Sequence, residues 1–493
     1  MAVTVERKKI QFLPDSRKVI ARFFDLNSMR TTELVLRILH MPNKETEITL
    51  NQILRDFSKR HRNITRIFKK HFNKVRYVLE NLGIDPDSLS ERKKLLIGSY
   101  FTMEYALESA AFFNPSIMED PDQSALNNGE KRIIVSFRAT GEGHISSLVF
   151  RRGIIDSKNN LKFSPTGNLI DEAERIKKHT YTRHIFEKKL EEMGIPVNLS
   201  EQVLERLPEK FVYPEIKRTV QELLENNEMT IERQKVLKEI LWLADSHYEL
   251  KFSLDTDISE RAIFPIMETE KQGIEDARFV RFTDSKGNVD YYATYTGYDG
   301  YTIIPKLLHT KDFFHFRSMP LFGRYAQDKN LALFPRKIKG KYAMLSRYDG
   351  QNNYIMYSDQ INIWEQARII QEPTRAWELI QVGNGGSPLE TEKGWLLITH
   401  GVGPVRRYSL GACLLDLENP TKVIGRLKEP LLVPNEKERE GYVPNVVYTC
   451  GAMIHNGHLI LPYAMADYSS GFALVDLDEL LAETARVAHP GQH

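Results

Sequence analysis

The sequence predicts a mainly β protein, a five-bladed β-propeller with an N-terminal helical extension and a helical insertion in the first blade. From about 252 to 474 the chain is rich in short apolar strands separated by turn residues. An early hairpin at 131–150 adds two more strands. Within the strand-rich part, a Gly-punctuated turn followed by an apolar strand recurs, with starts 53 to 63 residues apart, at 287–297, 340–350, 394–403 and 457–467. That period suits four-stranded blades, and the hairpin supplies the fifth. A β-sandwich stays open as the alternative.

The N-terminal part is expected to be helical. Between Glu47 and Leu82 apolar residues recur mostly at spacings of three and four, which is typical of an amphipathic helix. A second helix is expected to start near Ser90 and to run toward Ala111. The polar face of 47–82 is basic. Because the whole chain has a net charge of only +2, we interpret this face as a solvated surface or an oligomer contact.

Strand and helix signals alternate further along the chain. The segment 131–138 (KRIIVSFR) and the segment 145–150 flank a Gly-containing turn and predict a β-hairpin. Helical signals return between about 171 and 246. We therefore divide the chain into a helical extension (1–108), the first part of the propeller (109–165), a helical insertion (166–252) and the remainder of the propeller (253–493).

Composition argues against several classes of function. The chain has 493 residues, with 68 Lys and Arg against 66 Asp and Glu, so a dedicated nucleic-acid or membrane-surface protein is not expected. Its two cysteines, Cys413 and Cys450, cannot form a disulfide framework or a four-cysteine zinc site. Histidine spacing suggests no metal site, and no glycine-rich phosphate loop precedes a helix. With a charged N-terminus and no long apolar stretch, we expect a cytoplasmic protein without cofactors.

Two sets of residues could carry chemistry. The segment 273–278 (GIEDAR) places Glu275 and Asp276 beside Arg278, so that one acid can be held in a perturbed environment, although such a motif alone is usually a surface ion pair. The second set consists of cationic residues near other apolar strands, where a buried charge needs a partner. If they converge, they form an anion site. This set is Arg138, Lys337, Arg347 and His400.

An ordered series of motifs accompanies these residues. Upstream are FFNPSI (112–117) and SFRATGEG (136–143), and downstream follow GIEDAR, YYATYTGYDG, FPRKIKGKYAMLSR, GWLLITHGVG, LLDLENPTKVIGR, GYVPNVVYTCG and YAMAD. The series resembles glycoside hydrolase family 130, which contains β-mannoside phosphorylases and β-mannosidases on a five-bladed propeller. The resemblance covers about 112–165 and 253–480, and leaves the two helical parts outside.

The resemblance implies a role for each candidate. Asp276 falls on the family's catalytic aspartate, which acts as general acid through a sugar hydroxyl, although Ala277 replaces the proline that usually follows it. The residues that resemble the phosphate-binding set are Arg138, Lys337, Arg347 and His400, with Arg336 and Lys339 as alternatives to Lys337 and with Arg324 as a possible addition. The residues expected to bind the mannoside are Asn114, Glu275, Arg278, Tyr295 and Asp467, of which Tyr295 is a candidate aromatic platform.

Three functions remain open at this point. Inverting hydrolysis needs two carboxylates, whereas phosphate already carries negative charge and needs a cationic cradle instead of a base. One carboxylate with a basic cluster therefore favours phosphorolysis of β-mannosides to α-mannose 1-phosphate, with phosphate as co-substrate. The alternatives are a β-mannosidase, whose base could be Glu142, Glu275, Glu390 or Glu392, and a non-catalytic sugar-binding propeller. The linkage and the acceptor sugar stay open.

The helical additions are expected to pack against the propeller or another subunit, because their apolar faces cannot stand alone. We expect 1–108 to form a homo-oligomer contact and 166–252 to border the mouth of the active site.

Overall fold

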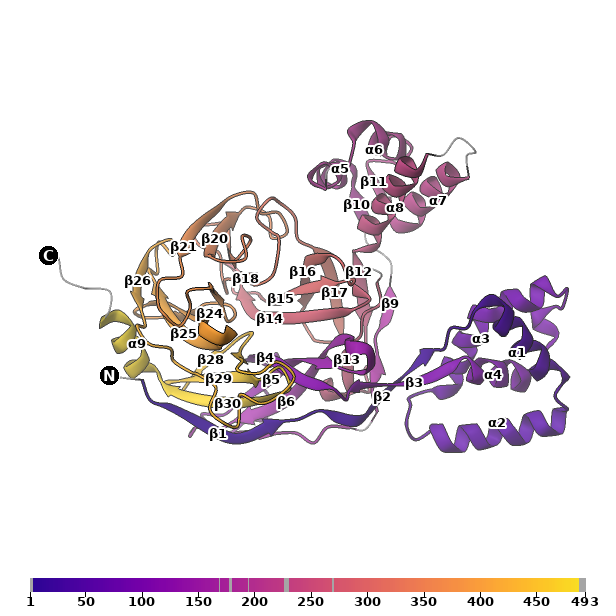
Figure 1. The fold of residues 1–493 in the computed structure, drawn as a ribbon, viewed down its shortest axis with the longest axis horizontal. Helices are drawn as coiled ribbons and strands as arrows, with labels where there is room; N and C mark the ends of the chain where they lie inside the picture. The colour runs from indigo at the N-terminus through magenta and orange to yellow at the C-terminus, as the bar shows by residue number, and fades with distance from the viewer. Residues whose placement is uncertain are drawn as a thin grey trace.

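The computed structural model describes residues 3–167, 169–176, 180–193, 195–225, 230–267 and 270–486. It confirms a mainly β protein with two helical additions (Figure 1). Within these residues, no helix is both long enough and apolar enough to cross a membrane.

Most of the strands can be divided into five groups of antiparallel neighbours, numbered here in chain order. The first group is β4 (Ala111–Glu119), β5 (Lys131–Thr140) and β6 (Ser146–Ile155), with β7 (Leu161–Phe163) and β13 (Arg261–Ile263) paired to β6. The second is β14 (Gly273–Thr283), β15 (Val289–Tyr298), β16 (Ile303–Thr310) and β17 (His315–Pro320). The first and second groups belong to one twelve-stranded sheet, in which Gly273 of β14 pairs with Ser146 of β6 in parallel. The third is β18 (Ala332–Leu333), β19 (Tyr342–Ser346), β20 (Asn353–Ser358) and β21 (Ala367–Gln371).

The last two groups follow the same order. The fourth is β22 (Gln381–Asn384), β24 (Gly394–Val402), β25 (Tyr408–Leu415) and β26 (Val423–Arg426), with β23 (Leu389–Thr391) beside β24. The fifth is β27 (Val447–Tyr448), β29 (His458–Met465), β30 (Ser469–Asp476) and β1 (Val5–Phe12), with β28 (Met453–His455) beside β29. The chain then ends its described part in helix α9 (Leu477–Arg486).

The internal repeat of the sequence falls on equivalent strands. Its four copies contain β15, β19, β24 and β29, each of which is the second strand of its group. The predicted hairpin is confirmed, because β5 pairs with β6 from Lys131↔Ile155 to Thr140↔Ser146, and β5 is the second strand of the first group. The repeat therefore marks one recurring unit of pairing.

Neighbouring groups contact each other in chain order. β4 contacts β14, β14 contacts β18, β19 contacts β22 and β25 contacts β27. The fifth group also contacts the first, through β29 and β4. The N-terminal strand β1 pairs with β30, so the beginning of the chain lies beside the end of the strand-rich part.

The N-terminal helices lie at one side of the strands, joined to them by β2 (Asp15–Phe23) and β3 (Thr102–Glu108) (Figure 1). The helices are α1 (Ser28–His40), α2 (Asn43–Phe57), α3 (Ile64–Asn81) and α4 (Glu91–Tyr100). The single helix expected over 47–82 is wrong: Asn63 has a φ of 51°, and this left-handed residue separates α2 from α3. Ser90 caps α4 as expected, but α4 ends at Tyr100 because the chain turns into β3.

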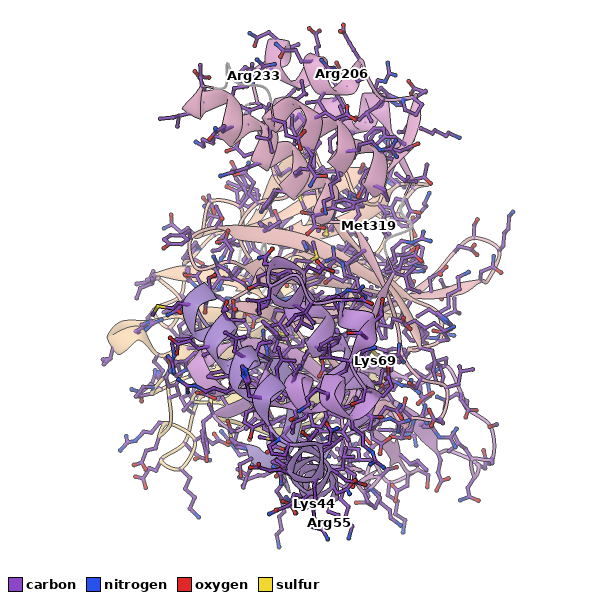
Figure 2. All side chains as sticks on the ribbon, turned by 90° about the vertical axis from the view of Figure 1, so that its right-hand side faces the viewer. Lys44, Arg55, Lys69, Arg206, Arg233 and Met319 are labelled. Carbon is purple, nitrogen blue, oxygen red and sulfur yellow. The ribbon has the colours of Figure 1, made fainter. Side chains whose placement is uncertain are left out.

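Three basic residues of α3 and of the connection before it form ion pairs. Arg60 binds Glu104 at 2.7 Å, Arg62 binds Asp255 at 2.8 Å and Lys69 binds Glu91 at 3.2 Å. Figure 2 shows Lys44, Arg55 and Lys69 on these helices, apart from Arg206 and Arg233 in the insertion. The second of these ion pairs joins the connection before α3 to the segment that follows the insertion.

The insertion forms a small helical bundle, which lies between the first and second groups along the chain. Its helices are α5 (Arg183–Glu192), α6 (Val197–Leu204), α7 (Tyr213–Leu224) and α8 (Ile231–Asp245). They bury an apolar cluster of their own, which also includes Phe322 just after β17. At its base, β12 (Tyr248–Lys251) pairs with both β17 and β9 (Glu174–Ile176) and so extends the second group.

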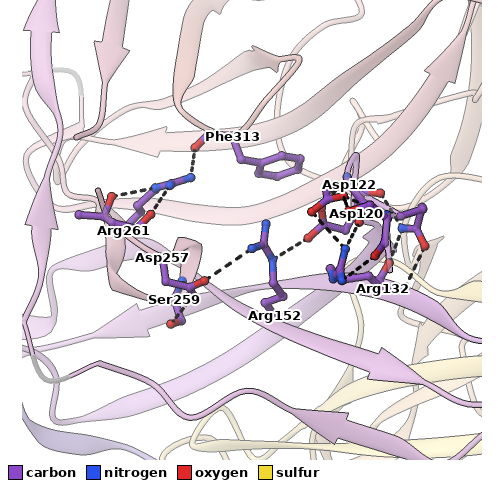
Figure 3. A network of polar contacts seen from close by, with 11 residues as sticks. Asp120, Asp122, Arg132, Arg152, Asp257, Ser259, Arg261 and Phe313 are labelled. Atoms are coloured by element: carbon purple, nitrogen blue, oxygen red, sulfur yellow. Dashed lines mark hydrogen bonds and ion pairs between the residues drawn. The ribbon is translucent and has the colours of Figure 1, made fainter. Parts of the chain in front are cut away.

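A network of charged residues connects the segment after the insertion, which contains Asp257 and Arg261, to the first group (Figure 3). Arg152 on β6 binds Asp120 at 2.7 Å and lies 3.6 Å from Asp257, which caps the short helix η3 (Ile258–Glu260). Arg261 donates to the carbonyl oxygen of Phe313 at 3.0 Å. The chain therefore returns from the insertion to a fixed position beside β6.

Candidate active site

Candidate residues from every group lie at the same end of the strands. In each group the start of the first strand pairs with the end of the second, as in Phe113↔Arg138, Glu275↔Thr296 and Gly383↔His400. Asn114 and Asp276 lie near the starts of β4 and β14. The others follow or end second strands: Arg138, Arg347, His400 and Asp467. Antiparallel pairing thus brings residues far apart in sequence to one end of the sheets.

Three of these residues have a left-handed backbone. Asn114, Asp276 and Asp467 have φ values of 50°, 54° and 51°. The first two lie at β-bulges, where the strand register shifts between Phe113 and Ser116 and between Glu275 and Arg278. A bulge turns a side chain away from the regular alternation, and such backbone strain is concentrated at functional sites.

Asp276 is buried among donors. Asn114 Nδ2 donates to Asp276 Oδ1 at 2.6 Å, and Arg138 Nη1 lies 3.4 Å from the same oxygen. Arg278 donates to the backbone carbonyl of Asp276 at 2.9 Å. Burial by itself would raise the pKa of the Asp276 carboxyl, but the charges of Arg138, Arg278 and Lys329 outweigh it and lower this pKa. Without a ligand, Asp276 is therefore an anion at neutral pH.

Glu275 is fixed by two cations. One carboxylate oxygen binds Arg138 Nη2 at 2.6 Å and the other binds Lys329 Nζ at 2.8 Å. Burial lowers the pKa of Lys329, but the charges of Glu275 and Asp276 outweigh this and raise it, so Lys329 stays a cation. The Glu275 side chain is thereby immobilised next to Asp276.

A second cationic centre joins the third and fourth groups. Arg347 Nη1 lies 3.3 Å from His400 Nε2, and His400 Nδ1 lies 3.2 Å from the carbonyl oxygen of Asn384. A carbonyl can only accept, so His400 donates from Nδ1 and Nε2 accepts from Arg347. Burial, together with the charge of Arg347, holds the pKa of His400 well below its usual value. The pair therefore carries one positive charge, on Arg347, whose Nη2 lies 3.8 Å from Asp328 Oδ2.

Tyr448 connects the two centres. Its hydroxyl oxygen accepts from Arg278 at 2.6 Å and from Asn330 at 2.8 Å, and its ring lies 4.9 Å from that of His400. Buried side chains thus link Asp276, through Arg278 and Tyr448, to the His400–Arg347 pair.

Asp467 differs from Asp276 in its electrostatics. It lies in the turn between β29 and β30. Burial raises the pKa of its carboxyl. The charge of Arg138 lowers this pKa and the charge of Asp276 raises it, and the result is a pKa of about 6. Two neighbouring carboxyl groups therefore have opposite pKa shifts, an arrangement frequent in sites of proton transfer.

Two expected site residues are not brought to this cluster. Lys337 lies in the exposed connection between β18 and β19, with its ammonium 4.2 Å from the Tyr342 ring centroid. The pairing Leu333↔Met344 places that connection at the opposite end of β19 from Arg347. The two alternatives to Lys337 also lie outside the cluster. Arg336 binds the exposed Glu390 at 2.7 Å, and Lys339 is exposed in the same connection. Arg324 is exposed, above the ring of Tyr325.

Tyr295 lies in the core and is 3 % exposed. Its hydroxyl contacts Glu270 at 2.8 Å and Ser318 at 2.6 Å, beside the fully buried ion pair of Glu270 and Lys306. Its hydroxyl and ring are thus engaged within the second group and offer no platform to a ligand.

Sequence reasoning missed other residues of the cluster. Lys329 and Asn330 lie in the connection between β17 and β18, and Asn384 ends β22. Tyr448 falls inside the motif GYVPNVVYTCG, which was its only signal. Among the described residues, no group of three or more His, Cys, Asp or Glu could hold a metal ion.

Comparison with known proteins identifies the family. A family model described as beta-1,4-mannooligosaccharide phosphorylase, that of glycoside hydrolase family 130, matches residues 230–486. The chain belongs to glycoside hydrolase family 130. The family match confirms the resemblance found in the sequence. It begins within the insertion and extends to the end of α9.

Three similar proteins are named as phosphorylases. A 1,2-beta-oligomannan phosphorylase of Thermoanaerobacter sp. is 37 % identical over 220 residues, covering 43 % of this chain and 71 % of the relative. A beta-1,4-mannooligosaccharide phosphorylase of Ruminococcus albus is 36 % identical over 168 residues, covering 31 % of this chain and 50 % of the relative. The structure of a beta-1,2-mannobiose phosphorylase from Listeria innocua has a TM-score of 0.45 at 22 % identity, covering 77 % of this chain and 93 % of the other.

Proposed function

We propose that this family 130 protein is an inverting β-mannoside phosphorylase, which transfers a mannosyl group from a β-mannoside to phosphate and forms α-mannose 1-phosphate. The observation that carries this proposal is the combination of a buried carboxylate held by donors, Asp276, with a separate cationic centre at Arg347 and His400. Relatives named as phosphorylases of β-mannosides, at 37 % and 36 % identity, support it.

The proposed site lies at the axis of a five-bladed propeller. The five strand groups are the blades, and their chain-order contacts, with the fifth group contacting the first, support this closure. The helices of 1–108 and 166–252 are additions to this propeller, although β1 belongs to the fifth blade and β12 extends the second.

Arg347 and His400 hold phosphate in this proposal. Arg347 supplies the charge, and a neutral His400 keeps its guanidinium in place through Nε2. Charge-assisted hydrogen bonds of a buried guanidinium to phosphate are strong and directional. Arg138 is engaged with Glu275 and Asp276, so its role is to hold those carboxylates beside the sugar. Lys337 is too far along the blade to share in this role.

The ionised state of Asp276 is compatible with proton transfer to the leaving group. Phosphate attacks the anomeric carbon as HPO₄²⁻, the bond from this carbon to the glycosidic oxygen breaks, and the proton of the phosphate ends on the departing hydroxyl. The products are α-mannose 1-phosphate as a dianion and the free acceptor, so atoms and charge balance. Asp276 needs only to relay a proton, through a sugar hydroxyl, and a bound dianion nearby raises its pKa toward that task.

The contacts of two of the four alternative bases, Glu275 and Glu390, disfavour them as the base of a hydrolysis. Glu275 has both carboxylate oxygens in ion pairs, with Arg138 and Lys329, and Glu390 is paired with Arg336 at the surface. A general base needs a lone pair directed at water.

The test is a panel of β-mannosides incubated with and without phosphate. We expect α-mannose 1-phosphate to form, with turnover that saturates in phosphate. Equal release of mannose in phosphate-free buffer would establish a β-mannosidase, and binding without turnover would establish a sugar-binding protein. The proposal includes no cofactor besides phosphate as co-substrate, and a homo-oligomer formed through 1–108, which light scattering of the intact chain would test.

A further inference from the structure

An exposed aromatic pair lies at the rim of the proposed site. His144, in the turn between β5 and β6, and Tyr442, in the loop before β27, have ring centroids 5.2 Å apart and planes inclined by 28°. Tyr442 is 65 % exposed. We propose that Tyr442, supported by His144, is the platform on which the acceptor sugar stacks, that is, the sugar that leaves in phosphorolysis. This inference rests on the proposed function.

The loop that carries Tyr442 lies directly on the turn of Asp467. A Cβ atom at Gly441 would lie 2.7 Å from the Cβ of Ala466 and 3.1 Å from the Cβ of Tyr468, the two neighbours of Asp467. Val443 N donates to the carbonyl oxygen of Ala466 at 2.9 Å. Tyr442 therefore lies between the close approach of Gly441 and the backbone hydrogen bond of Val443, both to the turn that bears a sugar-binding candidate.

The turn that carries His144 is fixed to the site from the other side. Tyr105 donates to the carbonyl oxygen of Glu142 at 3.0 Å, and Ser146 accepts from Arg138 Nε at 2.8 Å. His144 itself has a φ of 59°. Because both turns are held by buried partners, the stacked pair is arranged before any ligand binds, and little entropy is lost when a sugar docks.

The direction of the displacement selects this part of the rim for the acceptor. In an inverting reaction the nucleophile and the leaving group lie on opposite sides of the anomeric carbon. The proposed phosphate centre, Arg347 and His400, belongs to the third and fourth groups. Opposite to these two, in a ring of five, is the first group, which carries His144. Tyr442 borders it from the fifth group.

The chemistry of the loop fits a sugar ring. The exposed face of an aromatic ring packs against the C–H groups of a pyranose, while polar groups at its edge bind the hydroxyls. A hollow of about 450 Å³ lies in the same loop and is lined by Arg439, Glu440, Gly441, Pro444 and Asn445. Its charged side chains supply both donors and acceptors.

The test compares Tyr442→Ala with Tyr301→Ala. Tyr301 is 93 % exposed, in the turn of the second group that corresponds to the turn of His144, and serves as the control for loss of an exposed aromatic ring. In synthesis from α-mannose 1-phosphate and mannose, Tyr442→Ala should raise the KM for mannose about three- to tenfold, the range of an aromatic contact. The KM for α-mannose 1-phosphate should change less than twofold, Tyr442→Phe should behave as wild type, and Tyr301→Ala should leave both values unchanged.

Direct binding separates this inference from the proposed function. Calorimetry with a β-mannobiose needs no turnover, and a folded Tyr442→Ala should bind it about three- to tenfold more weakly than wild type. A protein that shows no phosphate-dependent turnover but loses mannobiose affinity in this variant refutes the phosphorylase and keeps the platform. Unchanged mannobiose affinity and unchanged acceptor KM in folded Tyr442→Ala would overturn the platform alone.

Discussion

Replacing Asp467 by asparagine should stabilise the fold at neutral pH while it impairs sugar binding. Burial near Asp276 raises the pKa of Asp467 from the ordinary 3.8 to about 6. A carboxyl whose pKa is raised by folding costs stability as it ionises, so its cost grows as the pH rises from below 4 and levels off above about 6. Asp467→Asn keeps the shape and removes this cost.

The magnitude follows from the size of the shift. A shift of about two units at 1.36 kcal/mol per unit corresponds to about 3 kcal/mol at pH 7.5 and about 1 kcal/mol at pH 4.5. The free energy of unfolding of Asp467→Asn should therefore exceed that of wild type, with a margin that increases with pH. Urea unfolding at pH 4.5, 6 and 7.5 measures this margin.

A control of opposite sign is available in an equivalent turn. Burial alone would raise the pKa of Asp299, between β15 and β16, but hydrogen bonds from the backbone of Thr302 and Tyr301 lower it. Its ionised form stabilises the fold at neutral pH, and Asp299→Asn should destabilise it there. A margin for Asp467→Asn that is absent, or that shrinks with rising pH, would refute the electrostatic reasoning for the site.

Further predictions concern the proposed reaction. Asp276→Asn should lower turnover at least about a hundredfold in a folded protein, and near-normal turnover on an unactivated mannoside would contradict the relay. Arg347→Met should raise the KM for phosphate about tenfold or more and change the mannoside KM little, with Arg336→Met as the surface control; equal effects of the two variants would remove the phosphate centre. Because Glu249 pairs with Ile176, a short turn can replace 177–247. This deletion should alter the KM for the mannoside more than kcat, and a change confined to kcat would contradict a position of the insertion at the mouth of the site.

The sequence predicted those parts that depend on local pattern. Turn and strand signals located the second strand of each group, and the motifs singled out Asp276, Arg138 and His400, which strand pairing brings to one end of the sheets. Lys337 was misplaced because the strand Tyr342–Ser346 has a cation-rich connection before it and Arg347 after it. Proximity in sequence does not tell which end of a strand faces the site.

Other features depend on contacts that local pattern does not encode. Lys329 binds Glu275 from a connection without periodicity, 54 residues away along the chain. The pairing of β1 with β30 joins the two ends of the chain. No glycine or proline indicates the break between α2 and α3 in the sequence. Asn63 supplies the left-handed residue there, because asparagine adopts this conformation more readily than most residues.

The positions of the two helical additions explain how the site tolerates them. The N-terminal helices enter between β2 and β3, and the insertion enters between β9 and β12. Neither interrupts a turn between the second and third strands of a group, where Asp467, Arg347 and His144 lie. At the insertion, β9 and β12 pair with each other, so the chain leaves and returns at one place. A large segment can then be accommodated at the cost of closing one short pairing, because the cost of loop closure grows only slowly with length.

The insertion does reach the site indirectly: Phe322 packs in its apolar cluster, and seven residues later Lys329 binds Glu275. A change in the packing of these helices should therefore shift Lys329 first and reach Asp276 through Glu275.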